Sequence, residues 1–294
     1  MKNKTPLRYA GGKSKAIKHL LPYFKGVTKV ISPFFGGGSL ECHLAGNGVK
    51  VEGSDIFKPL VLFWNEVINN KEHFTEYLKF YRPTNEGYNQ IKEELLSWEY
   101  TQDILKNWKT DYYKRNPIKI VDIKVASHFF FNHNLSYGPA YLGWASKIYL
   151  NNKKWNSMIE DIKILDTKNL SIKEQSFHDA ILNNPKEFLY LDPPYYTEKD
   201  GDNKMHAPIY PNKNIPVLHK DFNHELLRDL LKNHQGKFIL CYNNCETIRE
   251  YYKDFRQEFP QWNYSMGNGE TRIGKFRKDG NITKQSHEIL IIKD

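Results

Sequence analysis

Cysteine is scarce in this chain, and long apolar runs are missing. Only Cys42, Cys241 and Cys245 are cysteines among 294 residues, which is too few for a disulfide framework. They also lack the second pair or the nearby histidines of a zinc site. No apolar run approaches the roughly 18 residues of a membrane-spanning helix, and the start, MKNKTPLRYAGGK, lacks the apolar core of a secretory signal. We therefore expect a cytoplasmic protein with no metal and no membrane partner.

Basic residues outnumber acidic ones. The 43 Lys+Arg and 34 Asp+Glu give a formal net charge of +9. This surplus suits a polyanionic partner such as nucleic acid, although many basic proteins bind none. Apolar residues make up 39% and aromatic residues 14%, which is too hydrophobic for a disordered chain. The length allows one large domain or two smaller ones.

Two segments of the chain have α/β character. Residues 29–55 follow the pattern strand, glycine turn, helix, strand, which is a βαβ unit and predicts a parallel sheet. From about residue 162 onward, KEFLYLDPPYY, GKFILCYNN and HEILIIKD indicate strands, and HELLRDLLKNH and TIREYYKDF indicate helices. The part in between, residues 58–161, repeats apolar residues at helical spacing and is rich in aromatics. We interpret it as an inserted, mostly helical domain that ends in a loop or hairpin.

The glycine turn Phe34-Phe35-Gly36-Gly37-Gly38-Ser39 follows the first predicted strand. Such a turn lets a ligand approach the backbone where a helix begins, but a tight strand-to-helix turn explains it equally simply. Asp55 ends the next predicted strand, where a carboxylate can bind both hydroxyls of a ribose. It could instead cap the helix that begins near Lys58. The two features together favour ribose binding.

Asp192-Pro193-Pro194-Tyr195 closes another apolar strand. Two prolines make this edge rigid, so the Asp192 carboxylate and the Pro193 carbonyl can accept hydrogen bonds from one NH₂ group. Tyr195 can stack on a planar ring. The alternative is a strand that simply ends in a proline turn.

RYAGGK, FFGGGS and DPPY, in this order, resemble the Dam-like DNA adenine methyltransferases. KFILCYNNCETIREYY and TRIGKFRKDG…HEIL are similar to a strand-turn-helix and a C-terminal hairpin of the same family. The resemblance implies a Rossmann-like class I methyltransferase sheet with an inserted, mainly helical target-recognition domain. Residues 1–57 and 171–294 would form the catalytic, S-adenosylmethionine-binding domain, and residues 58–170 the domain that recognises DNA.

The resemblance also implies chemistry. A methyl group would pass from S-adenosylmethionine to N6 of an adenine flipped out of double-stranded DNA, leaving S-adenosylhomocysteine. Asp192, Pro193 and Tyr195 would be the catalytic residues. The cofactor would contact Tyr9 (the family usually has Trp), Lys13, Phe35, Gly36, Gly38, Asp55, Phe177 and Asp192. Ser176 stands where an Asp is frequent, so one hydrogen bond to the cofactor adenine is in doubt.

DNA contacts are expected at Arg8 and in the stretch 131–155. From their side-chain chemistry we select Asn132, Asn134, Tyr137, Lys147 and Lys153, because amides pair with base edges and cations with phosphates. The alternative is that the aromatics of this stretch are simply a helical core. The stretch lacks the Asn-Arg…Asn-Gly-Leu pattern of GATC-methylating relatives, which predicts another adenine-containing target. A cognate restriction endonuclease is a further possible partner. A cytosine N4 or RNA adenine methyltransferase, or an inactive nucleic-acid-binding module, are the remaining alternatives.

Overall fold

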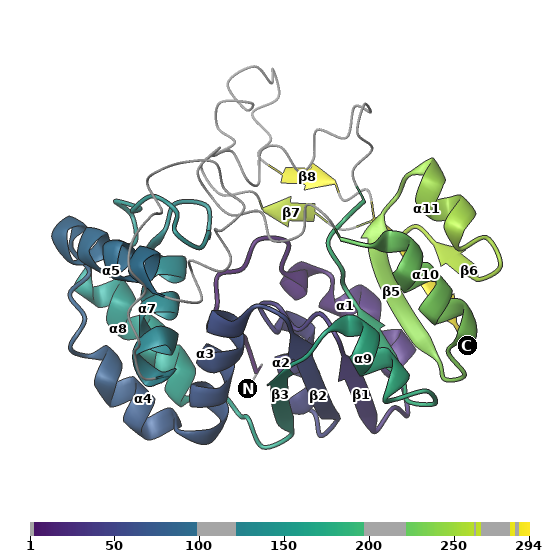
Figure 1. Ribbon diagram of the computed structural model, residues 1–294, viewed down its shortest axis with the longest axis horizontal. Coiled ribbons are helices and arrows are strands. Elements are labelled where there is room, and N and C mark those ends of the chain that lie inside the picture. Colours follow the sequence, from purple (N-terminus) through teal and green to yellow (C-terminus); the bar gives the residue numbers. More distant parts are fainter. Residues whose placement is uncertain (1–2, 99–121, 197–221, 262, 266–282, 286–287) are drawn as a thin grey trace, which may run out of the picture.

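A computed structural model describes residues 3–98, 122–196, 222–261, 263–265, 283–285 and 288–294 (Figure 1). Its centre is a seven-stranded sheet with the order β3-β2-β1-β4-β5-β9-β6. These strands are β1 (Lys29–Ser32), β2 (Lys50–Asp55), β3 (Leu170–Glu174), β4 (Leu189–Leu191), β5 (Phe238–Asn243), β6 (Arg256–Glu258) and β9 (Glu288–Lys293). The first five strands in this order run parallel, as predicted, and β9 is antiparallel to both of its neighbours. The α/β class is therefore confirmed, with a mixed sheet.

The order of the strands reverses between β1 and β4. Ile31 pairs with Leu189 across this switch point, while the other side of β1 pairs with β2. In open α/β sheets, ligands bind beyond the carboxyl ends of the strands at such a point. The glycine turn, Asp55 and Asp192 each follow or end one of these strands. Topology therefore brings the three sequence motifs to one edge of the sheet.

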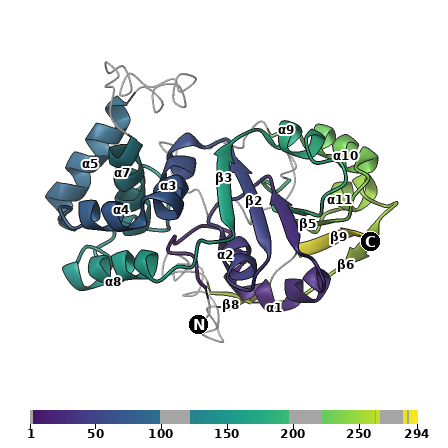
Figure 2. The ribbon, with the colours of Figure 1, turned by 90° about the horizontal axis from the view of Figure 1, so that it is seen from below.

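Helices cover both faces of the sheet (Figure 2). Helices α9 (Phe177–Leu182), α10 (His224–Asn233) and α11 (Glu246–Tyr251) lie on one face, and α1 (Ile17–Leu20) and α2 (Ser39–Ala45) on the other, with short 3₁₀ turns η1 (Lys13–Lys15) and η2 (Leu21–Phe24). Helix α10 shows why its sequence folds this way: Leu227 and Leu231, one turn apart, are fully buried on the sheet side. None of the described helices is long and apolar enough to cross a membrane.

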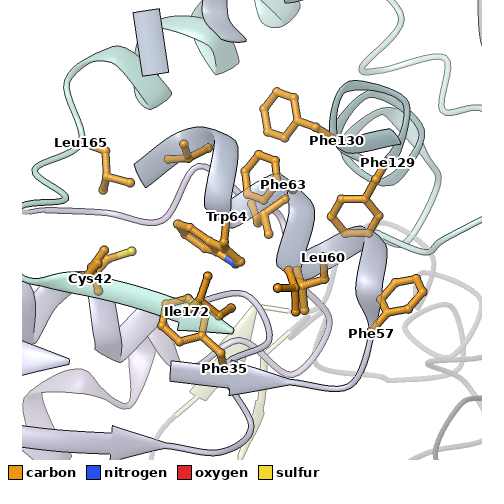
Figure 3. Close-up of a cluster of buried hydrophobic side chains, with 14 of the residues drawn as sticks. Phe35, Cys42, Phe57, Leu60, Phe63, Trp64, Phe129, Phe130, Leu165 and Ile172 are labelled. Atoms are coloured by element: carbon orange, nitrogen blue, oxygen red, sulfur yellow. The ribbon is translucent and has the colours of Figure 1, made fainter. Parts of the chain in front are cut away.

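A helical block lies beside the β3 edge of the sheet (Figure 1). It consists of α3 (Lys58–Asn69), α4 (Lys71–Leu78), α5 (Asn85–Ser97), α7 (Asp122–Leu135) and α8 (Asn152–Lys163). Helix α3 joins the block to the sheet through a continuous buried cluster (Figure 3). The Trp64 ring meets Phe35 edge-on at 5.1 Å between centroids, and Phe63 stacks on Phe130 of α7, also at 5.1 Å. Helix α3 packs against both the sheet and the other helices of the block. The predicted domain boundaries at residues 58 and 170 therefore stay a prediction.

Helix α7 occupies the start of the segment in which we expected the helical middle region to end in a loop or hairpin. Every residue from Val125 to Leu135 is buried. A helix that is covered on all sides has no polar face, so its sequence loses the helical repeat. The hairpin lies just beyond it: Ser136 and Ala145 form an antiparallel bridge, and the Tyr137 N–H donates to the Trp144 carbonyl at 2.7 Å. We call residues 136–151 the α7–α8 loop.

A second, two-stranded sheet pairs β7 (Asn263–Ser265) with β8 (Thr283–Gln285) in antiparallel fashion. The segment that is similar to a C-terminal hairpin, TRIGKFRKDG…HEIL, begins after β7 and includes β8. Its part TRIGKFRKDG, residues 271–280, lies outside the described residues.

Candidate active site

The glycine turn is held tightly between the sheet and the N-terminal segment. Gly36 and Gly38 have φ angles of 48° and 63°, in the left-handed region that favours glycine. A Cβ on Gly37 would lie 2.4 Å from the Cβ of Tyr9, so that position has room only for glycine. The Phe35 side chain is buried beneath the turn against Trp64, whose Nε1 donates to the Gly36 carbonyl at 3.0 Å. The structure thus packs Tyr9 against the turn and buries the Phe35 side chain beneath it.

Asp55 ties the turn to the start of α3. One carboxylate oxygen accepts from the Gly36 N–H at 3.1 Å, and the other accepts from the Phe57 N–H at 3.0 Å. Burial raises the pKa of Asp55, and these backbone donors oppose the rise. Each oxygen has a second lone pair, so the carboxylate can still accept bonds from a ligand. The ribose-acceptor alternative is compatible with this geometry, whereas Asp55 does not cap α3, whose N-cap is Phe57 and has no side-chain cap. The next residue, Ile56, is 65% exposed, and the sequence did not single it out as a site residue.

Lys13, Asp192 and Tyr195 meet at the end of β4. The buried Lys13 ammonium lies 2.7 Å from Asp192 Oδ1 and donates to the Tyr195 hydroxyl at 2.8 Å. A second carboxylate, Glu288 at the start of β9, lies 3.6 Å from the same nitrogen. A buried ammonium is stable only when it is paired and hydrogen-bonded. The Lys13 cation therefore joins two other predicted residues, Asp192 and Tyr195, and one that the sequence did not single out, Glu288.

Two carboxyl groups in this part of the molecule, Asp192 and Glu41, have raised pKa values. Burial raises the pKa of Asp192 to about 6, with Lys13 lowering it and Glu288 raising it further. Burial also raises the pKa of Glu41 on α2 to about 7, and the Ser32 hydroxyl donates to Glu41 at 2.8 Å. Perturbed carboxyl groups that gather at one edge of a sheet are typical of functional sites.

Asn243, the last residue of β5, locks the segment that follows Asp192. Its side-chain oxygen accepts from the Tyr196 N–H at 2.9 Å, and its amide donates to the Tyr196 carbonyl at 3.0 Å. Pro193 is buried between these elements. The backbone around Asp192 is therefore held from two sides, by ring constraint and by hydrogen bonds.

A cluster of three aromatic side chains, Phe34, Phe177 and Phe222, lies at the outer part of the same edge of the sheet. Phe177, the first residue of α9, stacks on Phe34 at 5.5 Å between centroids and contacts Phe222 at 5.1 Å. Gln175, just before it, donates its backbone N–H to the Asp55 carbonyl at 3.1 Å. Phe177 is thus close to Asp55 in the fold. Ser176, which stands where the family often has Asp, accepts a hydrogen bond from the Asp179 N–H and caps α9. This residue therefore has a structural role.

A family model described as "D12 class N6 adenine-specific DNA methyltransferase" matches residues 9–266. The chain belongs to this family. A curated relative, the modification methylase StsI of Streptococcus sanguinis, is 23% identical over 275 residues, which is 89% of this chain and 38% of that protein. The chain therefore spans less than half the length of this relative. The solved structure of a precorrin 8w decarboxylase from Methanobacterium thermoautotrophicum is 11% identical, with a TM-score of 0.35 and coverage of 98% and 94% of the two chains. A TM-score this low supports no inference.

Three residues around the family's DPPY segment escaped the sequence reasoning: Glu41, Asn243 and Glu288. Asn243 lies within a segment that resembled the family, so a signal existed at the level of the segment. Glu288 is brought to Lys13 only because β9 inserts between β5 and β6. Among the described residues, no group of three or more His, Cys, Asp or Glu side chains is placed to hold a metal ion.

Apart from Arg8, the residues expected to bind DNA fall into two groups. Tyr137, Lys147 and Lys153 are exposed on or beside the α7–α8 loop. Asn132 and Asn134, in contrast, are fully buried in α7, and their side-chain oxygens accept backbone N–H groups inside the protein. Asn132 accepts from the Leu142 N–H at 2.7 Å and thereby shapes the loop. A direct contact of these two amides with bases does not fit their positions, because α7 is buried on all sides.

Proposed function

We propose that the protein transfers a methyl group from S-adenosylmethionine to N6 of an adenine that is flipped out of double-stranded DNA. The observation that carries this proposal is the Lys13–Asp192–Tyr195 cluster at the switch point of the sheet, in a member of the N6 adenine family. Bound S-adenosylmethionine would supply a sulfonium-activated methyl group, and S-adenosylhomocysteine would remain. We expect the protein to act in the cytoplasm.

The reaction requires the N6 nitrogen of adenine to become a better nucleophile. Its lone pair is delocalised into the ring, and acceptors on both N–H groups favour a more pyramidal nitrogen. Asp192 and the Pro193 carbonyl would be these acceptors, with Lys13 keeping Asp192 ionised at neutral pH. The Tyr195 ring, held through its hydroxyl by Lys13, would stack on the base. Fixed orientation and preorganised charges would account for most of the rate.

The residues at the strand ends fit an adenosyl cofactor. Asp55 has lone pairs for the ribose hydroxyls, and the glycine turn allows close approach of the backbone. The half-exposed Phe177, stacked on Phe34, is an apolar surface for an adenine ring. Tyr9 and Lys13 would lie beside the methionine part.

Replacing Asp55 by alanine is expected to weaken binding of S-adenosylmethionine by roughly tenfold or more, because a charge-assisted hydrogen bond contributes about 1.5–3 kcal/mol. Binding of DNA should change much less. Calorimetry with each ligand separately checks this, with the exposed Asp229 on α10 replaced by alanine as the control. Unchanged cofactor affinity in the Asp55 variant would remove this residue from the site.

The helical block and its α7–α8 loop are the proposed reader of DNA. Trp144 and Tyr137 are 62% and 47% exposed on this loop, and Lys147 and Lys153 are exposed beside them. Aromatic side chains can wedge between bases while lysines bind phosphates. Asn132 would act indirectly, by holding Leu142 in its unusual conformation with φ at 57°.

Alanine substitutions at Tyr137, Trp144 and Lys147 should therefore change the choice of methylated site or weaken DNA binding, without lowering cofactor affinity. Sequencing of methylated positions after expression in a methylation-free host gives both the target and its change. We expect an adenine-containing target other than GATC. Finding GATC alone refutes that specificity, and variants with unaltered affinity and site choice refute the assigned reader.

The decisive experiment for the function itself is incubation with labelled S-adenosylmethionine and either DNA or RNA, followed by mass spectrometry of the nucleosides. N6-methyladenine in DNA supports the proposal. N4-methylcytosine, or methylation of RNA alone, shifts the substrate class, and no transfer with retained DNA binding indicates a binding module. The relative named a modification methylase makes a cognate restriction endonuclease a reasonable partner to seek.

A further inference from the structure

Arg8 fastens the N-terminal segment to the end of α7. Its backbone N–H donates to the Asn134 side-chain oxygen at 3.0 Å, and the Asn134 amide donates to the Pro6 carbonyl at 3.0 Å. The guanidinium then returns to the same place, with Nη1 donating to the carbonyls of Asn134 and, at 3.2 Å, Ser136. Asn134 is fully buried, so this junction is an internal part of the protein.

The other side of the Arg8 guanidinium covers the Tyr149 ring, with 3.5 Å from its central carbon to the ring centroid. Tyr149 lies near the far end of the α7–α8 loop, and Ser136 begins that loop. One side chain thus contacts both ends of the loop that we propose reads DNA. A planar guanidinium can donate to carbonyls and stack on an aromatic ring at once, which a lysine ammonium cannot match.

The same short segment leads directly to the catalytic cluster. Tyr9 stacks on His133 of α7 with 5.4 Å between ring centroids, and it packs against Gly37 of the glycine turn. A tight turn follows, in which the Gly12 N–H donates to the Tyr9 carbonyl at 3.1 Å. Lys13 comes next and pairs with Asp192. Only residues 9–12 separate Arg8, which contacts the loop, from Lys13, which pairs with Asp192. A displacement of Arg8 is therefore expected to displace Lys13 as well.

We propose that Arg8 is a positioning residue, which aligns Tyr9 and Lys13 with the α7–α8 loop, and that it does not bind a DNA phosphate. This inference rests on the proposed function for its effect on methyl transfer. It replaces the expectation from family resemblance, because Nη1 of the guanidinium already donates to two carbonyls of the protein and its flat face covers the Tyr149 ring. Burial, which lowers the pKa of Arg8, is consistent with an internal position.

The test compares Arg8→Gln, Arg8→Lys and Tyr149→Leu with the wild-type protein. The exposed Lys25, near the amino end of β1, is changed to Gln as a matched loss of one positive charge. Methyl transfer to sheared plasmid DNA gives kcat and KM. Affinity for a short mixed-sequence duplex is measured over a range of salt concentrations, because each lost phosphate contact lowers the slope of log K against log salt by about 0.9. Amide hydrogen exchange of residues 9–13 is followed in parallel.

We expect kcat to fall about tenfold in all three variants, with the salt slope unchanged and exchange of residues 9–13 faster. Combining Arg8→Gln with Tyr149→Leu should lower kcat little below that of Arg8→Gln alone, because Arg8→Gln already removes the guanidinium that stacks on Tyr149. Lys25→Gln should match the wild type in kcat and in exchange. A phosphate contact predicts the opposite pattern: a smaller slope in Arg8→Gln that Arg8→Lys restores, with normal exchange, and this result would overturn the inference.

A wild-type protein that transfers no methyl group would refute the proposed function. The exchange measurements would still decide whether Arg8 fastens this segment, so the two failures are distinguishable.

Discussion

Replacing Asp192 by alanine is expected to lower the rate of methyl transfer by at least roughly 10²–10³-fold, which is the usual effect of removing one preorganised group in an active site. The reason is the loss of one of two acceptors for the N6 hydrogens. The fold should persist, because Glu288 remains 3.6 Å from Lys13 and continues to pair with it. Single-turnover kinetics with saturating cofactor measure the chemical step directly.

Two variants sharpen this experiment. Asp192→Asn keeps one acceptor oxygen but loses the charge, so it should lie between the wild type and the alanine variant. Asp229→Ala removes an exposed carboxylate from α10 and should leave the rate unchanged. If the Asp192→Ala variant transferred methyl groups within about tenfold of wild type, or about 1.4 kcal/mol in the barrier, the assigned role would be wrong.

The second large effect concerns pH and the buried cation. Asp192 must be a carboxylate to accept from N6, and its pKa is raised to about 6. The rate should therefore fall as the pH drops through about 6, where the protonated acid accumulates. Replacing Lys13 by methionine removes the charge that lowers this pKa, so the fall should begin at a higher pH, and the rate at neutral pH should drop strongly.

Replacing Glu288 by glutamine is expected to shift the pKa of Asp192 in the opposite direction. The negative charge of Glu288 raises the pKa of Asp192, so the neutral variant should shift the acid limb to lower pH. Profiles of kcat/KM against pH for the three proteins test both signs, because kcat/KM reports the groups of the free enzyme, to which this pKa belongs. An acid limb that stays in place in both variants would show that another group controls it.

Much of the candidate site could be predicted from local sequence. Gly36 and Gly38 were recognisable because left-handed backbone favours glycine, and the prolines after Asp192 because they cannot continue a strand. The strand that ends at Asp55 follows from its position in a βαβ unit. The resemblance to the family then joined these short motifs, and the match over residues 9–266 confirmed that identification.

Other features lay beyond sequence reasoning because they depend on distant packing. Asn132 and Asn134 looked like amides for DNA bases, but helix α7 is enclosed on all sides and turns them inward. Glu288 begins an unremarkable apolar strand, and only its antiparallel insertion beside β5 places its carboxylate next to Lys13.

By itself, the sequence determined the α/β class, the helical middle region and the motifs at the strand ends, because these follow from backbone preferences of neighbouring residues and from apolar periodicity. The tertiary structure alone decided which charges meet. Lys13 reaches Asp192 and Glu288, and Arg8 reaches Asn134 and Tyr149, across more than a hundred residues of chain. Contacts at such separations are set by the order of strands and the packing of buried side chains, and no local pattern encodes them.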